Sequence, residues 1–482
     1  MDAKRISLHL LLFAGCFLAF RFAPGYPQIC DSRYSLLVAR NLVESGDSTL
    51  DAFVPADSAS RRAMPGYVAE TGLPYSILAL PVANGRVLYE GPVPASATTH
   101  YFYSYPLGSS AMSAPFVAWS KPPADPAQQA AWEDGLQLNL AALLCAGTVC
   151  LFTTIARTWL NELTSIASAL VFSFGSPVWS TMSRGLWSHT WAAFLLALAL
   201  LLLVRLDAKR SRDLVSGLII GALLFWCWFV RPQTAISSVA IGLFFLLHHR
   251  RAAIAATLSA ACCFAIFAVW SERQFGHWMP PCGYMLMPQL TFSGAAERLP
   301  LLLFSPSRGI VTTLPVVIPI AWVVLRYRQA LPAPQLVLPA VLAILAQIAL
   351  LACFPAWTGG ASFGPRLFTD VLPWVFLLGV LGIRAAADLQ GSFRSARGLA
   401  EASLFALCCC AGLFIHARGA ISPATWRWNQ SAGACQSSLH SWRQPQWLAG
   451  LILGHKEFAG KHLRKQKPRQ ARTQRPEKTR KT

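Results

Sequence analysis

The chain has 482 residues, of which 54% are hydrophobic and only 13% are charged. Soluble domains carry roughly 25% charged residues because their surface faces water, so this composition excludes a soluble enzyme, a disordered protein and a nucleic-acid-binding domain. Its apolar residues form blocks of about 18, the length of helix that crosses a bilayer. The net charge of +20 lies largely in short loops and in segment 455–482, which alone carries +9. We therefore predict an all-α polytopic membrane protein.

The first apolar block, 6–22, follows a short basic start. Phe13-Ala14-Gly15-Cys16 faintly resembles a lipoprotein cleavage site, which leaves a signal peptide as an alternative. Phe rather than Leu, three residues before the cysteine, favours an uncleaved helix. We predict that residues 1–22 form the first transmembrane helix, with the N-terminus in the cytoplasm because of its basic residues.

Residues 23–135 contain no block long enough to span a membrane, so they predict a large first outer loop. The apolar spacing of segment 31–46 is typical of an amphipathic helix that lies on the membrane surface. Segment 106–119 is apolar but short, which predicts a re-entrant or interfacial helix.

A β-hairpin is predicted within the same loop. Segment 77–90 alternates around Asn84-Gly85, a dipeptide that suits a two-residue hairpin turn. Pro81 lacks a backbone N–H, so it predicts an edge strand.

Cys30, Cys282 and Cys435 also fall in predicted outer segments, where a disulfide among them could form.

Ten further apolar blocks predict a transmembrane bundle within residues 136–420. They lie at 136–157, 163–180, 190–206, 213–230, 234–248, 252–270, 309–326, 334–354, 367–385 and 399–417. With the first helix, about 11 transmembrane helices are expected. Four basic loops separate some of the blocks, at 207–212, 248–251, 326–328 and 384–397. All four fall on the cytoplasmic side in this order, as the positive-inside rule requires.

The C-terminal region conflicts with that rule. Residues 421–482 are predicted to be an outer segment followed by a disordered basic tail. Eleven helices place this positive tail outside, so either segment 447–454 returns to the membrane or the count is wrong by one.

Polar residues beside the predicted helices are candidates for chemistry, because burying them near a membrane is costly. Asp31 is the first acid beyond the first helix, where it serves either as a helix N-cap or as a catalytic base. Arg184 and His189 lie at the membrane edge before the 190–206 block. They act either as interfacial anchors or, for His189, as a proton carrier.

Three arginines are candidates for binding an anion. Arg231 ends one block, and either snorkels to the headgroups or binds a ligand. Arg308 and Arg366 each follow a Gly- and Pro-containing loop and precede a block, so a positive side chain adjoins the free N–H groups of a helix start. That combination predicts a phosphate site; the alternative is a turn with an interfacial arginine.

These motifs, in this order, resemble the GT-C glycosyltransferase superfamily, in particular bacterial membrane proteins similar to protein O-mannosyltransferases and aminoarabinose transferases. The resemblance runs from about residue 6 to 420 and is carried by Asp31-Ser32-Arg33-Tyr34 with Ala39 and Gly46, Tyr105-Pro106-Leu107-Gly108 with Ala114-Pro115-Phe116, Leu186-Trp187-Ser188-His189, Arg231-Pro232, Ser305-Pro306-Ser307-Arg308-Gly309, Trp357-Thr358-Gly359-Gly360 and Phe363-Gly364-Pro365-Arg366.

The resemblance implies transfer of a sugar from a polyprenyl-phosphate donor to an acceptor hydroxyl on the outer face of the membrane. It implies that Asp31 is the catalytic base and that Arg366 and Arg308 hold the donor phosphate. From their type and position we add His189 as a second catalytic candidate and Arg231 as a third phosphate ligand. The remaining implied substrate contacts are Tyr34, Arg184, Tyr105, Trp357, Gly359 and Gly360. The expected partners are the lipid-linked sugar, the bilayer and an unidentified glycan, lipid or protein acceptor, with no nucleic acid. The expected location is the bacterial inner membrane, with the site on the periplasmic side.

The chain departs from its relatives at three positions of the pattern. Ser32 follows Asp31 where relatives often have a second acid, His189 and Thr190 stand where another acid is common, and Tyr105-Pro106 replaces Lys-Pro. A single carboxylate without a DxD motif predicts neither a metal nor a cofactor. The alternatives are a lipid or sugar transporter or flippase, and a non-catalytic polysaccharide-assembly protein.

Overall fold

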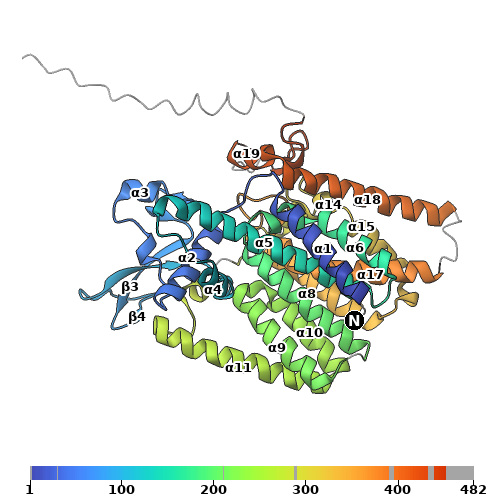
Figure 1. Ribbon diagram of the computed structural model, residues 1–482, viewed down its shortest axis with the longest axis horizontal. Coiled ribbons are helices and arrows are strands. Elements are labelled where there is room, and N and C mark those ends of the chain that lie inside the picture. The colour runs from blue at the N-terminus through green and yellow to red at the C-terminus, as the bar shows by residue number, and fades with distance from the viewer. Residues whose placement is uncertain are drawn as a thin grey trace, which may run out of the picture.

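The computed structural model describes residues 3–29, 31–209, 211–286, 290–389, 396–431 and 439–451. It consists of a large helical bundle with a lobe of short helices and strands at one end (Figure 1). The N-terminus of the first helix lies at the bundle end away from this lobe (Figure 1). Cys30, Cys435 and the basic tail after Leu451 fall outside the described residues.

The lobe holds two small antiparallel sheets. Its elements are α2 (Asp31–Glu44), η1 (Asp51–Phe53), α3 (Ser58–Arg62), β1 (Tyr67–Val68), β2 (Leu73–Pro74), β3 (Ile77–Ala83), β4 (Arg86–Val87), β5 (Thr98–Tyr103) and α4 (Gly108–Ser120). Strands β1 and β2 form one sheet, and the order β4-β3-β5 forms the other. Asn84 and Gly85 join β3 to β4 with φ values of 52° and 73°, as a two-residue turn with positive φ requires.

The predicted edge position of Pro81 is wrong, because β3 is the central strand of its sheet. Pro81 pairs with Thr99 of β5, and its carbonyl accepts a hydrogen bond from the N–H of Leu88 at 2.8 Å on the other side. The missing N–H faces the same side, so the pair Pro81–Leu88 keeps one hydrogen bond instead of two. A proline is tolerated here because this one bond lies at the end of the short strand β4.

Helix α2 differs from the surface helix expected. Nine of its 14 residues are buried, including Ser35, whose hydroxyl lies 2.9 Å from that of Ser109 on α4. The helix packs against α4, α5 and β5. Its first residue, Asp31, is thereby fixed between the lobe and the bundle.

The bundle begins with α1 (Ala3–Arg21) and ends with a short C-terminal segment. Between them lie α5 (Pro126–Ala156), α6 (Glu162–Phe174), α7 (Pro177–Ser180), η2 (Met182–Arg184), α8 (Ser188–Asp207), α9 (Asp213–Val230), η3 (Pro232–Thr234), α10 (Ala235–His248), α11 (Arg250–Phe275), α12 (Pro281–Leu286), α13 (Ala295–Phe304), α14 (Ile310–Thr313), α15 (Val317–Arg326), η5 (Arg328–Ala330), η6 (Pro334–Leu336), α16 (Val337–Ala352), η7 (Arg366–Val371), α17 (Leu372–Leu389) and α18 (Ala396–Ile421). The C-terminal segment holds α19 (Pro423–Ser431) and η8 (Gln446–Leu448).

The expected count of 11 transmembrane helices is not confirmed. Within the described ranges, seven helices are long and apolar enough to cross a membrane, and an eighth is obtained if α6 and the bent segment after it form one span. The 163–180 block is bent by 50° after Phe174, and the 309–326 block is interrupted around Pro315. Proline and small residues interrupt the helical hydrogen bonds, and apolar content alone does not reveal these breaks.

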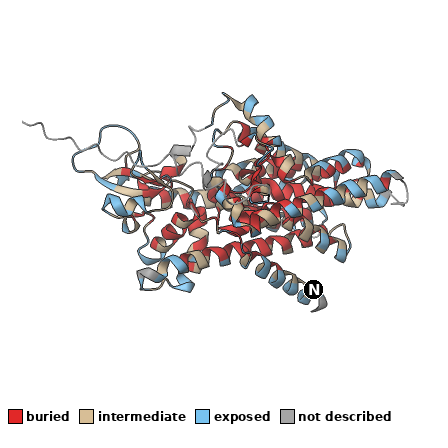
Figure 2. Cartoon of the chain, turned by 90° about the horizontal axis from the view of Figure 1, so that it is seen from above, coloured by how far each residue is buried: buried red, intermediate tan, exposed pale blue. Residues whose placement is uncertain are grey.

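Helices α8 and α17 form the centre of the bundle. Of the apolar stretch of α17, 89% is buried, against 22% for α18 and 28% for α11, whose exposed apolar faces suit contact with lipid. Figure 2 shows the buried residues gathered in the middle of the bundle. At the core, the rings of Phe152 and Phe376 stack with centroids 4.3 Å apart.

The C-terminal segment packs at the same end of the bundle as Asp31. The N–H of Gly25, shortly after α1, donates to the carbonyl of Ala420 at 2.9 Å, and the rings of Tyr26 and Trp426 stack with centroids 5.0 Å apart. Residues of α19 therefore lie at this end of the bundle.

Candidate functional site

The carboxylate of Asp31 is held by side chains from two distant parts of the chain. The hydroxyl of Tyr75 donates to Oδ1, and Nη1 of Arg366 lies 3.5 Å from Oδ2. In the described part of the chain, no N–H of α2 donates to this carboxylate, so Asp31 begins the helix without capping it by its side chain. Its backbone carbonyl accepts a hydrogen bond from Tyr103 at 3.0 Å.

Arg366 begins η7, directly after the Gly- and Pro-containing loop. Its guanidinium lies over the ring of Trp187, 4.1 Å from the ring centroid, which is a favourable cation–π distance. Gly359 packs against the same group, since a Cβ at Gly359 would lie 3.2 Å from Nε of Arg366. That Nε is buried and has no hydrogen-bond partner. The guanidinium is therefore held in place while some of its hydrogen-bonding capacity remains unused.

Asp370 ties His189 and Arg231 together one turn further along η7. Its carboxylate is 1% exposed; Oδ1 lies 2.9 Å from Nδ1 of His189, and Oδ2 lies 2.6 Å from Nε of Arg231. His189 is the second residue of α8 and Arg231 directly follows the last residue of α9, so three elements meet at this acid. A buried charge is stable only when it is paired, and Asp370 supplies the counter-charge for Arg231.

The two clusters form one site because Arg366 and Asp370 share η7. Two carboxylates, Asp31 and Asp370, face two guanidinium groups, Arg366 and Arg231. The site thus combines a carboxylate that can accept a proton with a guanidinium that can bind an anion.

Arg308 lies apart from this pair and supports the loop that presents Arg366. It is 2% exposed and donates to the backbone carbonyls of Gly360, Ser362 and Gly364, and to Oδ1 of Asn429 at 2.8 Å. Burial, and then the nearby charge of Arg366, lowers the pKa of the Arg308 guanidinium to about 9. Its terminal nitrogens are thus engaged by protein oxygens.

The other predicted substrate contacts are spread around this centre. Arg184 is buried and donates to the carbonyls of Phe20 and Gly25 at 3.0 Å each, which fastens the end of α1. The hydroxyl of Tyr34 donates to the carbonyl of Pro65 at 2.7 Å, inside the lobe. Trp357 is buried in the bundle core, and the carbonyl of Gly360 accepts a hydrogen bond from Arg308. The ring centroid of Tyr105 lies 5.5 Å from that of Tyr103.

Sequence reasoning missed Asp370, Tyr75 and Tyr103. An acid inside the predicted 367–385 block was a usable signal, because ionisable residues within apolar spans usually have a function. The tyrosines gave no such signal, since their contacts with Asp31 depend on how the lobe packs. One departure from the family pattern is also explained. His189 stands where relatives often have an acid, and Asp370 brings an acid to His189 from a distant element.

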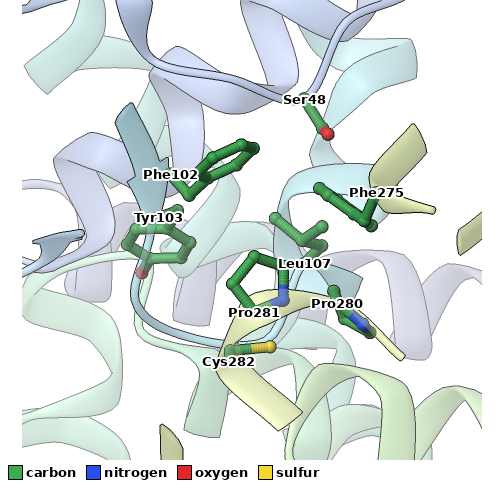
Figure 3. A pocket seen from close by; sticks show the side chains of 8 residues that line it. All are labelled: Ser48, Phe102, Tyr103, Leu107, Phe275, Pro280, Pro281 and Cys282. Carbon is green, nitrogen blue, oxygen red and sulfur yellow. The ribbon is translucent and has the colours of Figure 1, made fainter. Parts of the chain in front are cut away.

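A small apolar pocket lies beside the site, with Tyr103 in its wall. It is lined by Ser48, Phe102, Tyr103, Leu107, Phe275, Pro280, Pro281 and Cys282 (Figure 3). Burial, and then the charge of Asp31, raises the pKa of the Tyr103 hydroxyl well above its ordinary value. Tyr103 therefore stays protonated and remains a hydrogen-bond donor to Asp31. Among the described residues, no group of three or more His, Cys, Asp or Glu side chains could hold a metal ion.

No family model matches the sequence, and no curated protein matches it. Solved structures that match include ArnT from Cupriavidus metallidurans bound to undecaprenyl phosphate, at 12% identity and a TM-score of 0.47, covering 85% of this chain and 64% of that chain. The apo state of the same protein matches at 11% identity and a TM-score of 0.44, covering 88% and 72%. The chain thus spans about two thirds of the length of the first of these. ArnT is an aminoarabinose transferase, one of the groups that the sequence motifs resemble.

Proposed function

We propose that this protein is an integral membrane glycosyltransferase that moves a sugar from a polyprenyl phosphate to an acceptor hydroxyl on the outer face of the membrane. The observation that carries the proposal is the convergence of Asp31 and Arg366, 3.5 Å apart, where the lobe meets the bundle. One provides a base and the other a phosphate-binding cation, which are the two groups that this reaction needs.

The reaction assigns a separate task to each group. The acceptor O–H gives its proton to Asp31 while its oxygen bonds to the anomeric carbon of the sugar. The bond from that carbon to the phosphate oxygen breaks, and the polyprenyl phosphate leaves with the electron pair. Arg366, preorganised by Trp187 and Gly359, stabilises the charge of this leaving group.

The orientation of the bundle supports an outer site. Basic residues gather in the loops around 207–212, 248–251 and 326–328, which join helices at their ends away from Asp31, and Lys and Arg favour the cytoplasmic side. The exposed apolar faces of α11 and α18 fit a lipid environment for the polyprenyl chain. The buried charges described here lie at helix ends, which favours a surface reaction over a transport path through the bilayer.

The test uses the full-length protein in lipid nanodiscs. Undecaprenyl phosphate mannose and undecaprenyl phosphate aminoarabinose serve as donors, with an envelope extract as acceptor, and release of undecaprenyl phosphate is measured. We expect release with at least one donor, and its loss in Asp31→Asn with donor binding retained. Asp57→Asn, which changes an exposed acid that caps α3, is the matched control. Donor binding without release by the wild type would favour a transporter, and absence of donor binding would overturn the proposal.

A further inference from the structure

Both carboxylate oxygens of the proposed base are occupied. Arg366 faces Oδ2 of Asp31, and the hydroxyl of Tyr75 donates to Oδ1. An acceptor hydroxyl must donate to one of these same oxygens before its proton can be transferred. Tyr75 thus presents the functional group of the acceptor at the position that the acceptor needs.

The backbone of Tyr75 is fixed, whereas its ring is accessible. Its N–H donates to the carbonyl of Gly66 at 3.0 Å, and its carbonyl accepts from the hydroxyl of Ser104 at 3.3 Å. The next residue, Ser76, is fully buried, whereas Tyr75 itself is 45% exposed. A rotation of the side chain can therefore move the hydroxyl away from Asp31 without moving the backbone that joins β2 to β3.

Gly66 sets the position of the ring. A Cβ on Gly66 would lie 2.7 Å from Cε1 of Tyr75, closer than side-chain carbons approach one another, and Gly66 has a φ of +79°. Glycine is the residue that permits both this close approach and this backbone conformation. Gly66 therefore leaves the space in the lobe that the Tyr75 ring occupies beside Asp31.

We infer that Tyr75 is a gate that covers Asp31 until an acceptor hydroxyl displaces it. This inference rests on the proposed function. Water is also an acceptor, and an uncovered base beside a bound donor would hydrolyse the sugar phosphate. The Tyr75 hydroxyl excludes water from Oδ1, whereas a correctly bound acceptor replaces the lost hydrogen bond with its own. Tyr75 is thus a specificity residue that sets the ratio of transfer to hydrolysis.

The first experiment compares Tyr75→Phe with Tyr67→Phe in nanodiscs. Tyr67 lies on β1 of the same lobe, and no hydrogen bond links its hydroxyl to another described residue. In Tyr75→Phe, donor hydrolysis without acceptor should rise about tenfold to a hundredfold, the effect of losing one hydrogen bond to a charged group on the opening equilibrium. The KM for acceptor should fall while kcat for transfer is kept. Unchanged hydrolysis, or loss of kcat, would overturn the gate.

Two further measurements keep the inference testable. Gly66→Ala pushes the ring without removing the hydroxyl, so it should also raise the ratio of hydrolysis to transfer; a folded variant with the wild-type ratio contradicts the inference. A double-mutant cycle of Tyr75→Phe and Asp31→Ala on the thermal midpoint needs no substrate, and Ala, unlike Asn, cannot accept the hydrogen bond from Tyr75. Non-additive midpoint shifts support the contact and additive shifts refute it, even if the wild type turns over no donor and the proposed function fails.

Discussion

The guanidinium of Arg366 lies 3.5 Å from the carboxylate of Asp31, although 335 positions separate the two residues in the chain. In this ion pair, each side chain is a counter-ion of the other. In the proposed mechanism, a donor phosphate that draws Arg366 toward itself would also remove one of the two partners of Asp31. The proposal therefore links binding of the donor to the availability of the base through one ion pair.

Replacing Asp31 by Asn should abolish sugar transfer while the protein still folds. The amide keeps the size of the side chain and can still accept from Tyr75, but it cannot take the acceptor proton. We expect kcat to fall by roughly 10²-fold to 10⁴-fold, the usual contribution of a general base. Size-exclusion elution and the thermal midpoint check the fold, with Asp57→Asn alongside. Transfer at the wild-type rate would remove Asp31 from the mechanism.

Arg366→Lys should weaken donor binding although the charge is kept. Lysine cannot lie flat on the Trp187 ring or bind a phosphate through two parallel N–H groups. The dissociation constant for undecaprenyl phosphate should rise about tenfold, equivalent to about 1.4 kcal/mol. Arg62→Lys, at the exposed end of α3, is the control. Equal affinities in the two variants would show that the phosphate binds elsewhere.

Asp370→Asn should destabilise the protein, because it leaves Arg231, whose side chain is 13% exposed, without a counter-charge. Breaking a buried pair on one side costs about 3–5 kcal/mol, so the thermal midpoint should fall clearly. Adding Arg231→Gln removes the orphaned charge and should restore part of the midpoint. A midpoint in the double variant no higher than in Asp370→Asn would show that Asp370 does not act as the counter-ion of Arg231.

The sequence predicts the membrane class, the lobe helix at Asp31 and the loops that carry Arg308 and Arg366, because these depend on local hydropathy and turn residues. It cannot predict the partner of each charge. Arg308 and Arg366 have similar sequence surroundings, yet one binds loop carbonyls and the other faces Asp31, a difference set by tertiary packing. Helix breaks near Phe174 and Pro315 also escape hydropathy, because the residues on both sides stay apolar.

The C-terminus should lie on the same side of the membrane as the lobe. This follows from the packing of Ala420 and Trp426 against the residues after α1, and from the absence of an apolar block in 455–482. Epitope tags after Pro92 and after Thr482 should both be detected on intact spheroplasts. A tag after Ala208 should need permeabilisation. Detection of the C-terminal tag only after permeabilisation would contradict this topology.

Cys282 should resist thiol reagents at neutral and mildly alkaline pH. Burial raises the pKa of its thiol from 9.0 to about 12. At pH 8 the thiolate fraction is therefore roughly one in ten thousand, against about one in ten for an ordinary thiol. Labelling should increase as the pH approaches 12 or when the lobe unfolds. Peptide-level mass spectrometry after maleimide treatment checks this, and rapid labelling at pH 8 in the folded protein would show that the pocket wall opens.

The side chain of Asn429 is engaged at both ends: Oδ1 accepts from Arg308 at 2.8 Å, and Nδ2 donates to the carbonyl of Ser362 at 3.1 Å. Asn429 also begins the triplet Asn429-Gln430-Ser431, an acceptor sequence for N-linked glycans. In a eukaryotic secretory pathway, a glycan could be added to this nitrogen only before the C-terminal segment closes over the loop. The fraction of chains that carry a glycan at Asn429 would then increase with the time that the C-terminal segment takes to pack. Glycosylation at this residue can therefore be used to follow the folding of the C-terminal segment.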